Sequence, residues 1–173
     1  LHDFSLMLDI RKRIHLTGKG PRYLAIAGDK AYVTEYFTDT LAVVDLSTQQ
    51  QIGSVPLAPK PQMSLARQGE MLFHDATICR QQWQSCSSCH PDGRADALNW
   101  DLRNDGVGNS KNTKSLLLSH ETPPSMALGV RADAEAAVRS GLAHILFADR
   151  PESEAQAIDA YLRSLHPVAS PYL

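Results

Sequence analysis

Cys86-Ser87-Ser88-Cys89-His90 is the stretch that decides how the rest of this chain is interpreted. Two residues separate the cysteines, and a histidine follows the second cysteine directly. This spacing lets the two thiols bond the two vinyl groups at one edge of a haem, while the adjacent imidazole reaches the iron. The sequence therefore predicts one covalent haem c, with Cys86 and Cys89 as the thioether residues and His90 as the proximal iron ligand.

Other chemistries use the same residue types. Two cysteines at this spacing can also supply half of a zinc site or form a redox-active disulfide. The chain has three cysteines and no second pair at this spacing to complete a zinc cage. A zinc-binding or purely structural module built from Cys79, Cys86, Cys89 and His90 is the alternative. Under the haem interpretation Cys79 is left free.

The composition is that of a globular protein without a strongly charged surface. The chain has 173 residues, of which 43% are hydrophobic, and a formal net charge of −2. These values fit one domain or two small ones, and they exclude a basic face for nucleic acid. No apolar run is long enough to form a transmembrane segment.

Covalent haem attachment takes place outside the bacterial cytoplasm, so the haem interpretation predicts an exported protein. Residues 1–10 contain acids and lack a basic stretch before an apolar run, so they do not form a signal peptide. We therefore expect a mature form or a part of a longer exported protein, located in the periplasm or at the bacterial cell surface.

Short β-type runs separated by turn residues occupy the first third of the chain. The runs are residues 22–27, 31–36, 41–46 and 50–57. This pattern predicts an antiparallel β-meander. Two earlier runs, residues 6–9 and 13–16, look like the last two strands of a preceding copy and indicate a faint internal repeat.

This part of the chain resembles a blade of a YVTN-type β-propeller. The stretch from Gly20 to Ile26, the run Tyr32-Val33-Thr34-Glu35 and the stretch from Thr40 to Asp45 follow in the order of such a blade. The resemblance implies that residues 1–58 are a partial propeller of about one and a half blades. A propeller needs several blades to close its ring, so we expect a piece of a longer propeller, with association through its exposed edge. A small independent meander is the alternative.

Helical patterns dominate after a proline-rich linker over residues 59–64. Ser64 is expected to cap a helix over residues 65–74. Asp133 is expected to cap a second helix within residues 132–148, whose Gly141 weakens the helical pattern. A third helix is expected to start at Pro151, and residues 91–125 are expected to form mostly loop.

Two of the expected helices resemble the first and last helices of class I cytochromes c. The first carries Arg67-Gln68-Gly69-Glu70-Met71-Leu72-Phe73, and the last runs from Ala157 to Leu165. In that family the two helices cross closely at a glycine among aromatic residues, and Gly69, Phe73 and Tyr161 fit these places. The resemblance implies an all-α, cytochrome c-like domain over residues 65–173. The expected fold class is therefore α+β, a β-meander followed by this helical domain.

The sixth position of the iron has several candidate ligands. Met126 follows Thr122-Pro123-Pro124-Ser125, whose prolines would hold a stiff loop. The stretch from Ser115 to Met126 also resembles the ligand loop of the di-haem cytochrome c peroxidase family, which implies Met126 as the distal ligand. The chain departs from that family at Ala127, where a histidine is usual, and in having one haem motif. His120 or an open iron face are the alternatives. Weaker candidates are Met63, Met71, His74, His144 and His166.

Other side chains could complete a haem pocket. Trp83 and Trp100 could pack on the porphyrin, and Arg94, Arg103 and Lys114 could pair with its propionates. The sequence thus predicts a mono-haem domain for electron transfer with a redox partner that it does not identify. A peroxidase- or oxidase-like centre is the alternative enzyme, and it would require an open iron face and a second haem.

Overall fold

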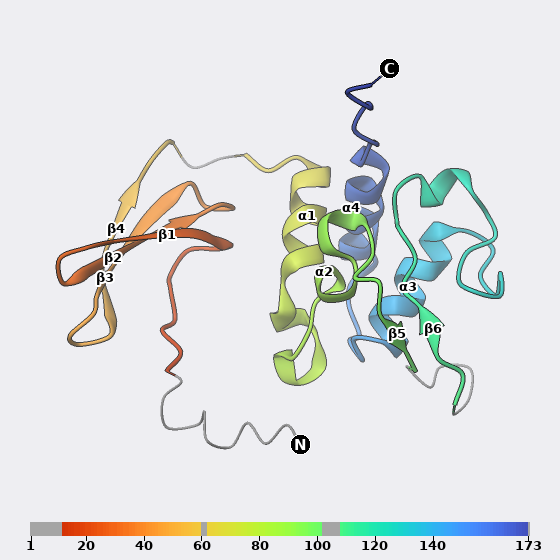
Figure 1. Ribbon diagram of the computed structural model, residues 1–173, viewed down its shortest axis with the longest axis horizontal. Helices are drawn as coiled ribbons and strands as arrows, with labels where there is room; N and C mark the ends of the chain where they lie inside the picture. Colours follow the sequence, from red (N-terminus) through yellow and green to blue (C-terminus); the bar gives the residue numbers. More distant parts are fainter. Residues whose placement is uncertain (1–11, 60–61, 102–107, 173) are drawn as a thin grey trace. The chain divides into compact units, whose positions relative to one another are not determined.

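The computed structural model describes residues 12–59, 62–101 and 108–172. The chain divides into two compact units, the first ending at Gln62 and the second beginning at Met63 (Figure 1). A four-stranded antiparallel sheet forms the first unit and helices dominate the second, so the α+β class is confirmed.

The sheet contains four strands in sequence order, each antiparallel to the next. Strand β1 (Pro21–Ala27) pairs with β2 (Lys30–Glu35), then follow β3 (Thr40–Asp45) and β4 (Gln50–Pro56). Alternate residues of the two central strands are buried, namely Ala31, Val33 and Glu35 in β2 and Ala42 and Val44 in β3. Side chains alternate between the two faces of a strand, so one face of these two strands is buried. The meander expected from the β-type runs and the turn residues between them is present.

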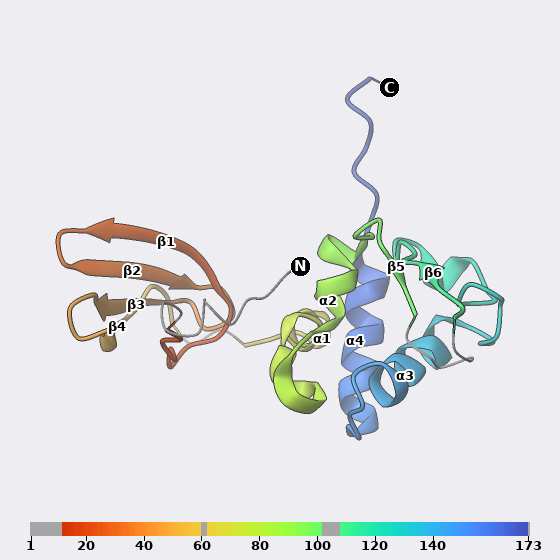
Figure 2. The ribbon, with the colours of Figure 1, turned by 60° about the horizontal axis from the view of Figure 1, so that its bottom comes forward.

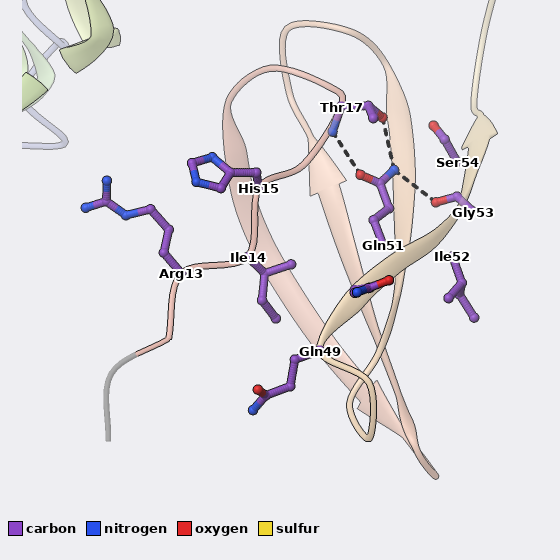
Figure 3. A pocket seen from close by; sticks show the side chains of 10 residues that line it. Arg13, Ile14, His15, Thr17, Gln49, Gln51, Ile52, Gly53 and Ser54 are labelled. Atoms are coloured by element: carbon purple, nitrogen blue, oxygen red, sulfur yellow. Dashed lines mark hydrogen bonds between the residues drawn. The ribbon is translucent and has the colours of Figure 1, made fainter. Parts of the chain in front are cut away.

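The expected strand over residues 13–16 does not form, and the expected strand over residues 6–9 lies outside the described residues. Residues 13–15 and Thr17 instead lie along the edge of β4, where they line an open groove of about 550 Å³ with residues 49–54 (Figure 3). The backbone N–H of Thr17 donates to the side-chain oxygen of Gln51, 2.8 Å away. The Thr17 N–H is therefore satisfied by the Gln51 side chain, whereas in a strand it would donate to a backbone carbonyl of the neighbouring strand.

A buried carboxylate holds residues 18–20 against the sheet. Glu35 is 1% exposed. Its two oxygens accept hydrogen bonds from the backbone N–H of Gly18 at 2.8 Å and from the hydroxyl of Thr40 at 2.6 Å. The N–H of Tyr36 donates to the carbonyl of Gly20 at 2.9 Å, which continues the same attachment.

The second unit contains four α-helices among its described residues: α1 (Leu65–His74), the single turn α2 (Cys86–Cys89), α3 (Ala134–His144) and α4 (Glu152–Ser164). Short 3₁₀ turns lie at Ala76–Ile78, Arg80–Gln82, Pro91–Gly93 and Ser119–Glu121 (η2 to η5). The expectation of an all-α domain needs a correction. Within residues 91–125, which were expected to form mostly loop, two short strands form: β5 (Asn99–Trp100) and β6 (Lys111–Asn112). They pair with each other as a small antiparallel ladder.

The caps expected from the sequence define the helix starts. The Ser64 side chain accepts from the N–H of Arg67, and the Asp133 side chain accepts from the N–H of Ala136. Helix α3 is shorter than residues 132–148, since it begins after its cap and ends at His144. Beyond that point the chain turns away with Phe147 at a φ of +50°, outside the helical region.

Helices α1 and α4 lie side by side, with α3 beside α4 (Figures 1 and 2). A side-chain carbon on Gly69 would clash with the backbone carbonyl of Ala157, so glycine is required where these helices cross. Phe73 packs on Tyr161 with ring centroids 5.2 Å apart. The close crossing and the aromatic contact expected from the sequence are thus both present.

Candidate functional site

A cavity of about 470 Å³ lies within the second unit. Its wall combines Cys86, Cys89 and His90 with residues 109 and 111–116, the loop before α3, and residues of α3 and α4. Apolar members of the wall include Leu116, Val138, Leu142, Ile158 and Leu162. A mostly apolar cavity of this size with a few polar groups is typical of a cofactor or small-molecule site.

Helix α2 places both cysteines of the Cys86–His90 run on the cavity. Cys86 begins this single turn and Cys89 ends it, and both line the cavity. The side chains of Ser85 and Ser88 cap the turn reciprocally, which fixes its start. Both thiols are free. The turn therefore presents two thiols to one cavity from one rigid element.

Burial controls the ionisation of these thiols. It raises the pKa of the Cys86 thiol to about 12. Burial also raises the pKa of Cys89, with a further contribution from the negative charge of Asp96. Both side chains are therefore protonated at neutral pH.

His90 lines the same cavity, and its ring is oriented by backbone carbonyls. The Nδ1 atom lies 2.9 Å from the carbonyl oxygen of Lys114 and 3.2 Å from that of Arg94. Carbonyls only accept, so Nδ1 carries the proton, and burial lowers the pKa of the ring. The neutral tautomer leaves the Nε2 lone pair available to a metal ion, an arrangement typical of ligating histidines.

Met126 also lines the cavity, although a long segment separates it from His90 in sequence. Its loop is closed by a pair of backbone hydrogen bonds between Ser125 and Arg131, at 2.9 and 3.3 Å. Met126 itself has a φ of +72°, and the N–H of Gly129 donates to its carbonyl at 3.1 Å. Such a backbone costs about 1–3 kcal/mol for a non-glycine residue and is concentrated at functional sites.

The cavity wall separates the remaining candidates. His120 is not among the lining residues, and its Nε2 lies 3.5 Å from a carboxylate oxygen of Glu121. The weaker ligand candidates are absent from the wall as well, namely Met63, Met71, His74, His144 and His166. Met126 is therefore the sequence-predicted distal candidate that shares a cavity with His90.

The tryptophans and cations expected around a haem also divide into residues that line the cavity and residues that do not. Trp100 lines the cavity and donates from its indole N–H to Asp96 at 2.8 Å, whereas Trp83 is 58% exposed and lies outside the wall. Lys114 lines the cavity and Arg94 does not. Arg103 lies outside the described residues.

The chain is similar to a subunit of hydrazine synthase. The relative is hydrazine synthase subunit gamma of Kuenenia stuttgartiensis, 41% identical over 61 residues, which are 35% of this chain and 17% of that protein. A solved structure of the Kuenenia stuttgartiensis hydrazine synthase pressurised with 20 bar xenon contains a similar chain. The TM-score is 0.57 at 27% identity, covering 65% of this chain and 40% of that chain. No protein-family model matches the sequence.

A zinc site at Cys86–His90 would need further ligand side chains close by. The described residues include no group of three or more histidine, cysteine or acidic side chains arranged to hold a metal ion. Cys79 is buried in the helical core and does not line the cavity.

No helix within the described ranges is long and apolar enough to cross a membrane.

Ser119 and Gly141 are among the lining residues that were not predicted as site residues from the sequence. Ser119 begins η5, and its hydroxyl oxygen is buried without a hydrogen-bond partner among the described residues. Gly141 lies within α3 and faces open space. A glycine inside a helical pattern is unusual, and this was the sequence feature that could have drawn attention to Gly141. An isolated serine in a loop, such as Ser119, is not unusual in sequence.

Proposed function

We propose that the second unit is a mono-haem c-type cytochrome domain that transfers electrons. Cys86 and Cys89 bind the haem through thioethers, His90 is the proximal iron ligand and Met126 is the distal one. The observation that carries this proposal is the single cavity whose wall includes all four side chains.

The attachment chemistry fits free, protonated thiols. Each S–H would add across one vinyl double bond of a haem. The sulfur would form a bond to one vinyl carbon and the hydrogen atom would go to the other carbon, so that no oxidant or reductant is consumed. The Lys114 carbonyl accepts a hydrogen bond from Nδ1 of His90, which would leave the Nε2 lone pair free to bind the iron. Methionine–histidine ligation raises the reduction potential and leaves no open coordination position, which suits electron transfer.

The comparisons support a redox role at a coarser level. The chain is similar to the gamma subunit of hydrazine synthase, of which it spans 17%. We infer that it is likewise a part of a larger redox protein. The first unit contributes part of a YVTN-type β-propeller to that protein, which is exported to the periplasm or cell surface, where covalent haem attachment occurs.

The test is to produce the full chain with and without a bacterial haem-maturation system. Attached haem gives a c-type visible spectrum and stays with the polypeptide after denaturation. The double variant Cys86→Ala/Cys89→Ala is the control and should lose all covalent haem. Colourless protein that contains zinc would contradict the proposal, and carbon monoxide binding by the reduced wild type would favour a peroxidase-like centre.

A further inference from the structure

Asp96 lies outside the cavity wall but is hydrogen-bonded to two residues that form it, Trp100 and Thr113. One carboxylate oxygen accepts a hydrogen bond from the indole N–H of Trp100 at 2.8 Å. The other oxygen accepts from the backbone N–H of Leu98 at 3.0 Å, and the Thr113 side chain also donates to this carboxylate. Three donors therefore hold the Asp96 carboxylate in one place.

Asp96 is also joined to the turn that carries the cysteines. Its backbone N–H donates to the carbonyl of Cys89 at 3.1 Å. Its partner Thr113 precedes Lys114, whose carbonyl oxygen lies 2.9 Å from Nδ1 of His90. Asp96 thus links helix α2 with the segment that orients the His90 ring.

The Asp96 carboxylate carries a negative charge at neutral pH. The hydrogen bond from the Leu98 N–H lowers its pKa, and those from the other two donors add to this effect. Burial raises the pKa of Cys89, and the charge of Asp96 raises it further. Burial lowers the pKa of His90, and the same charge acts in the opposite direction. Coulomb interactions weaken with distance, so Asp96 places a negative charge close to both residues.

We propose that Asp96 is a positioning residue that lowers the reduction potential of the haem, an inference that rests on the proposed function. Ferric iron carries one more positive charge than ferrous iron, so a fixed negative charge nearby favours the ferric state. The bonds of Asp96 also hold the segment whose Lys114 carbonyl accepts from Nδ1 of His90. Such a bond makes an imidazole a more basic ligand, which favours the ferric state as well. Asp96 therefore opposes Met126, the ligand that raises the potential.

The experiment is a redox titration of the full chain with attached haem, comparing wild type with three variants of Asp96. Asp96→Asn and Asp96→Ser remove the charge and keep an oxygen that can accept from the Leu98 N–H, whereas Asp96→Glu keeps the charge. Asp92→Asn is the matched control. Asp92 lies closer to His90 in sequence but is exposed, and asparagine readily adopts its φ of +52°.

Asp96→Asn and Asp96→Ser should shift the reduction potential upward, and Asp96→Glu should stay closer to wild type. Asp92→Asn should shift the potential less than either neutral variant does, because water and salt screen an exposed charge. A purely structural role of Asp96 would not make the shift follow the charge of the side chain.

Two further measurements exclude trivial causes of a shift. The visible spectrum and carbon monoxide binding show whether His90 and Met126 still bind the iron in each variant. Unfolding followed by tryptophan fluorescence shows that each variant folds, since Trp83 and Trp100, the two tryptophans of the chain, belong to the second unit.

A potential in both neutral variants equal to that of wild type, or a rise no larger than that of Asp92→Asn, would overturn this inference while leaving haem attachment intact. Neutral variants that fold but attach no haem would assign Asp96 to attachment and would overturn it as well. A wild type that acquires no haem under maturation would overturn the proposed function, so the two failures are distinguishable.

Discussion

Gly69 of α1 lies against the backbone carbonyl of Ala157 in α4, so closely that no side chain fits between the two helices. This contact fixes the pair of helices on which Phe73 and Ile158 complete one side of the cavity. The wall of the candidate site therefore depends on a backbone contact outside it.

Gly69→Ala should destabilise the second unit by about 3 kcal/mol, because the added methyl group forces the two backbones apart. Chemical denaturation followed by tryptophan fluorescence measures this loss. Gly141→Ala in the haem-free protein is the matched control, since its methyl group meets open space and should stabilise. Similar midpoints for Gly69→Ala and wild type would contradict the close crossing.

Cys89→Ala should leave at most one thioether. Haem retained by the polypeptide after denaturation in acidified organic solvent should fall sharply relative to wild type. Cys79→Ala is the control, because Cys79 is buried outside the cavity wall and should keep both thioethers in the protein that folds. Full covalent retention in Cys89→Ala would remove this residue from the attachment site.

Met126→Ala should open the iron to carbon monoxide and lower the reduction potential, since a methionine ligand favours the reduced iron. Visible spectra with and without carbon monoxide, together with a redox titration, measure both effects. His120→Ala should change neither, because His120 does not line the cavity. The reverse outcome would transfer the distal position to His120.

Glu35→Ala should destabilise the sheet by about 2–3 kcal/mol, because the Gly18 N–H and the Thr40 hydroxyl lose their buried acceptor. Faster amide hydrogen exchange at Gly18 would report this loss directly. Asp29→Ala removes a carboxylate from the same sheet unit but from an exposed ion pair with Lys30, and it should change stability little. Equal exchange at Gly18 in wild type and Glu35→Ala would refute the role of this carboxylate.

Asp159 predicts a pH dependence. Burial raises the pKa of this carboxyl, although the Arg139 guanidinium 2.6 Å away favours its charged form. A raised pKa means that the folded protein holds the proton more tightly than the unfolded chain does. The wild type should therefore gain stability from Asp159 as the pH falls through its folded pKa toward the usual value of 3.8.

Asp159→Asn cannot make this gain. The stability of the variant relative to wild type should decrease between pH 7 and about pH 4, a comparison that denaturant titrations at the two values provide. A relative stability that is constant or rises on acidification would show that the charged form is favoured in the folded protein. Any pH-independent effect of the substitution on stability is the same at both pH values and therefore cancels in this comparison.

Local patterns predicted the elements of this fold, because each pattern depends on neighbours in sequence. The β-type run over residues 31–36 predicted a strand, and the caps at Ser64 and Asp133 predicted helix starts within a residue of those observed. The sequence of residues 13–16 suggested a strand as well. A strand requires a backbone partner, and at this edge the Gln51 side chain takes the N–H of Thr17 instead.

The cavity was predictable only in part. The Cys86–His90 run is contiguous, so the prediction of haem attachment needs only the spacing of Cys86, Cys89 and His90. The inclusion of Met126 and the exclusion of His120 depend on how a loop folds back between distant segments. The unpartnered hydroxyl of Ser119 depends on burial in three dimensions, which no spacing encodes.

The bridge between Ser125 and Arg131 ties together the two ends of the loop that carries Met126. As the proposed iron ligand, the Met126 sulfur would be held in place by this closed loop when the charge on the iron changes by one unit. Little rearrangement of atoms would then accompany the gain or loss of an electron. The rate of electron transfer would then depend on how closely a partner's redox centre can approach the haem edge. The loop that carries Met126 would keep the same conformation in both oxidation states.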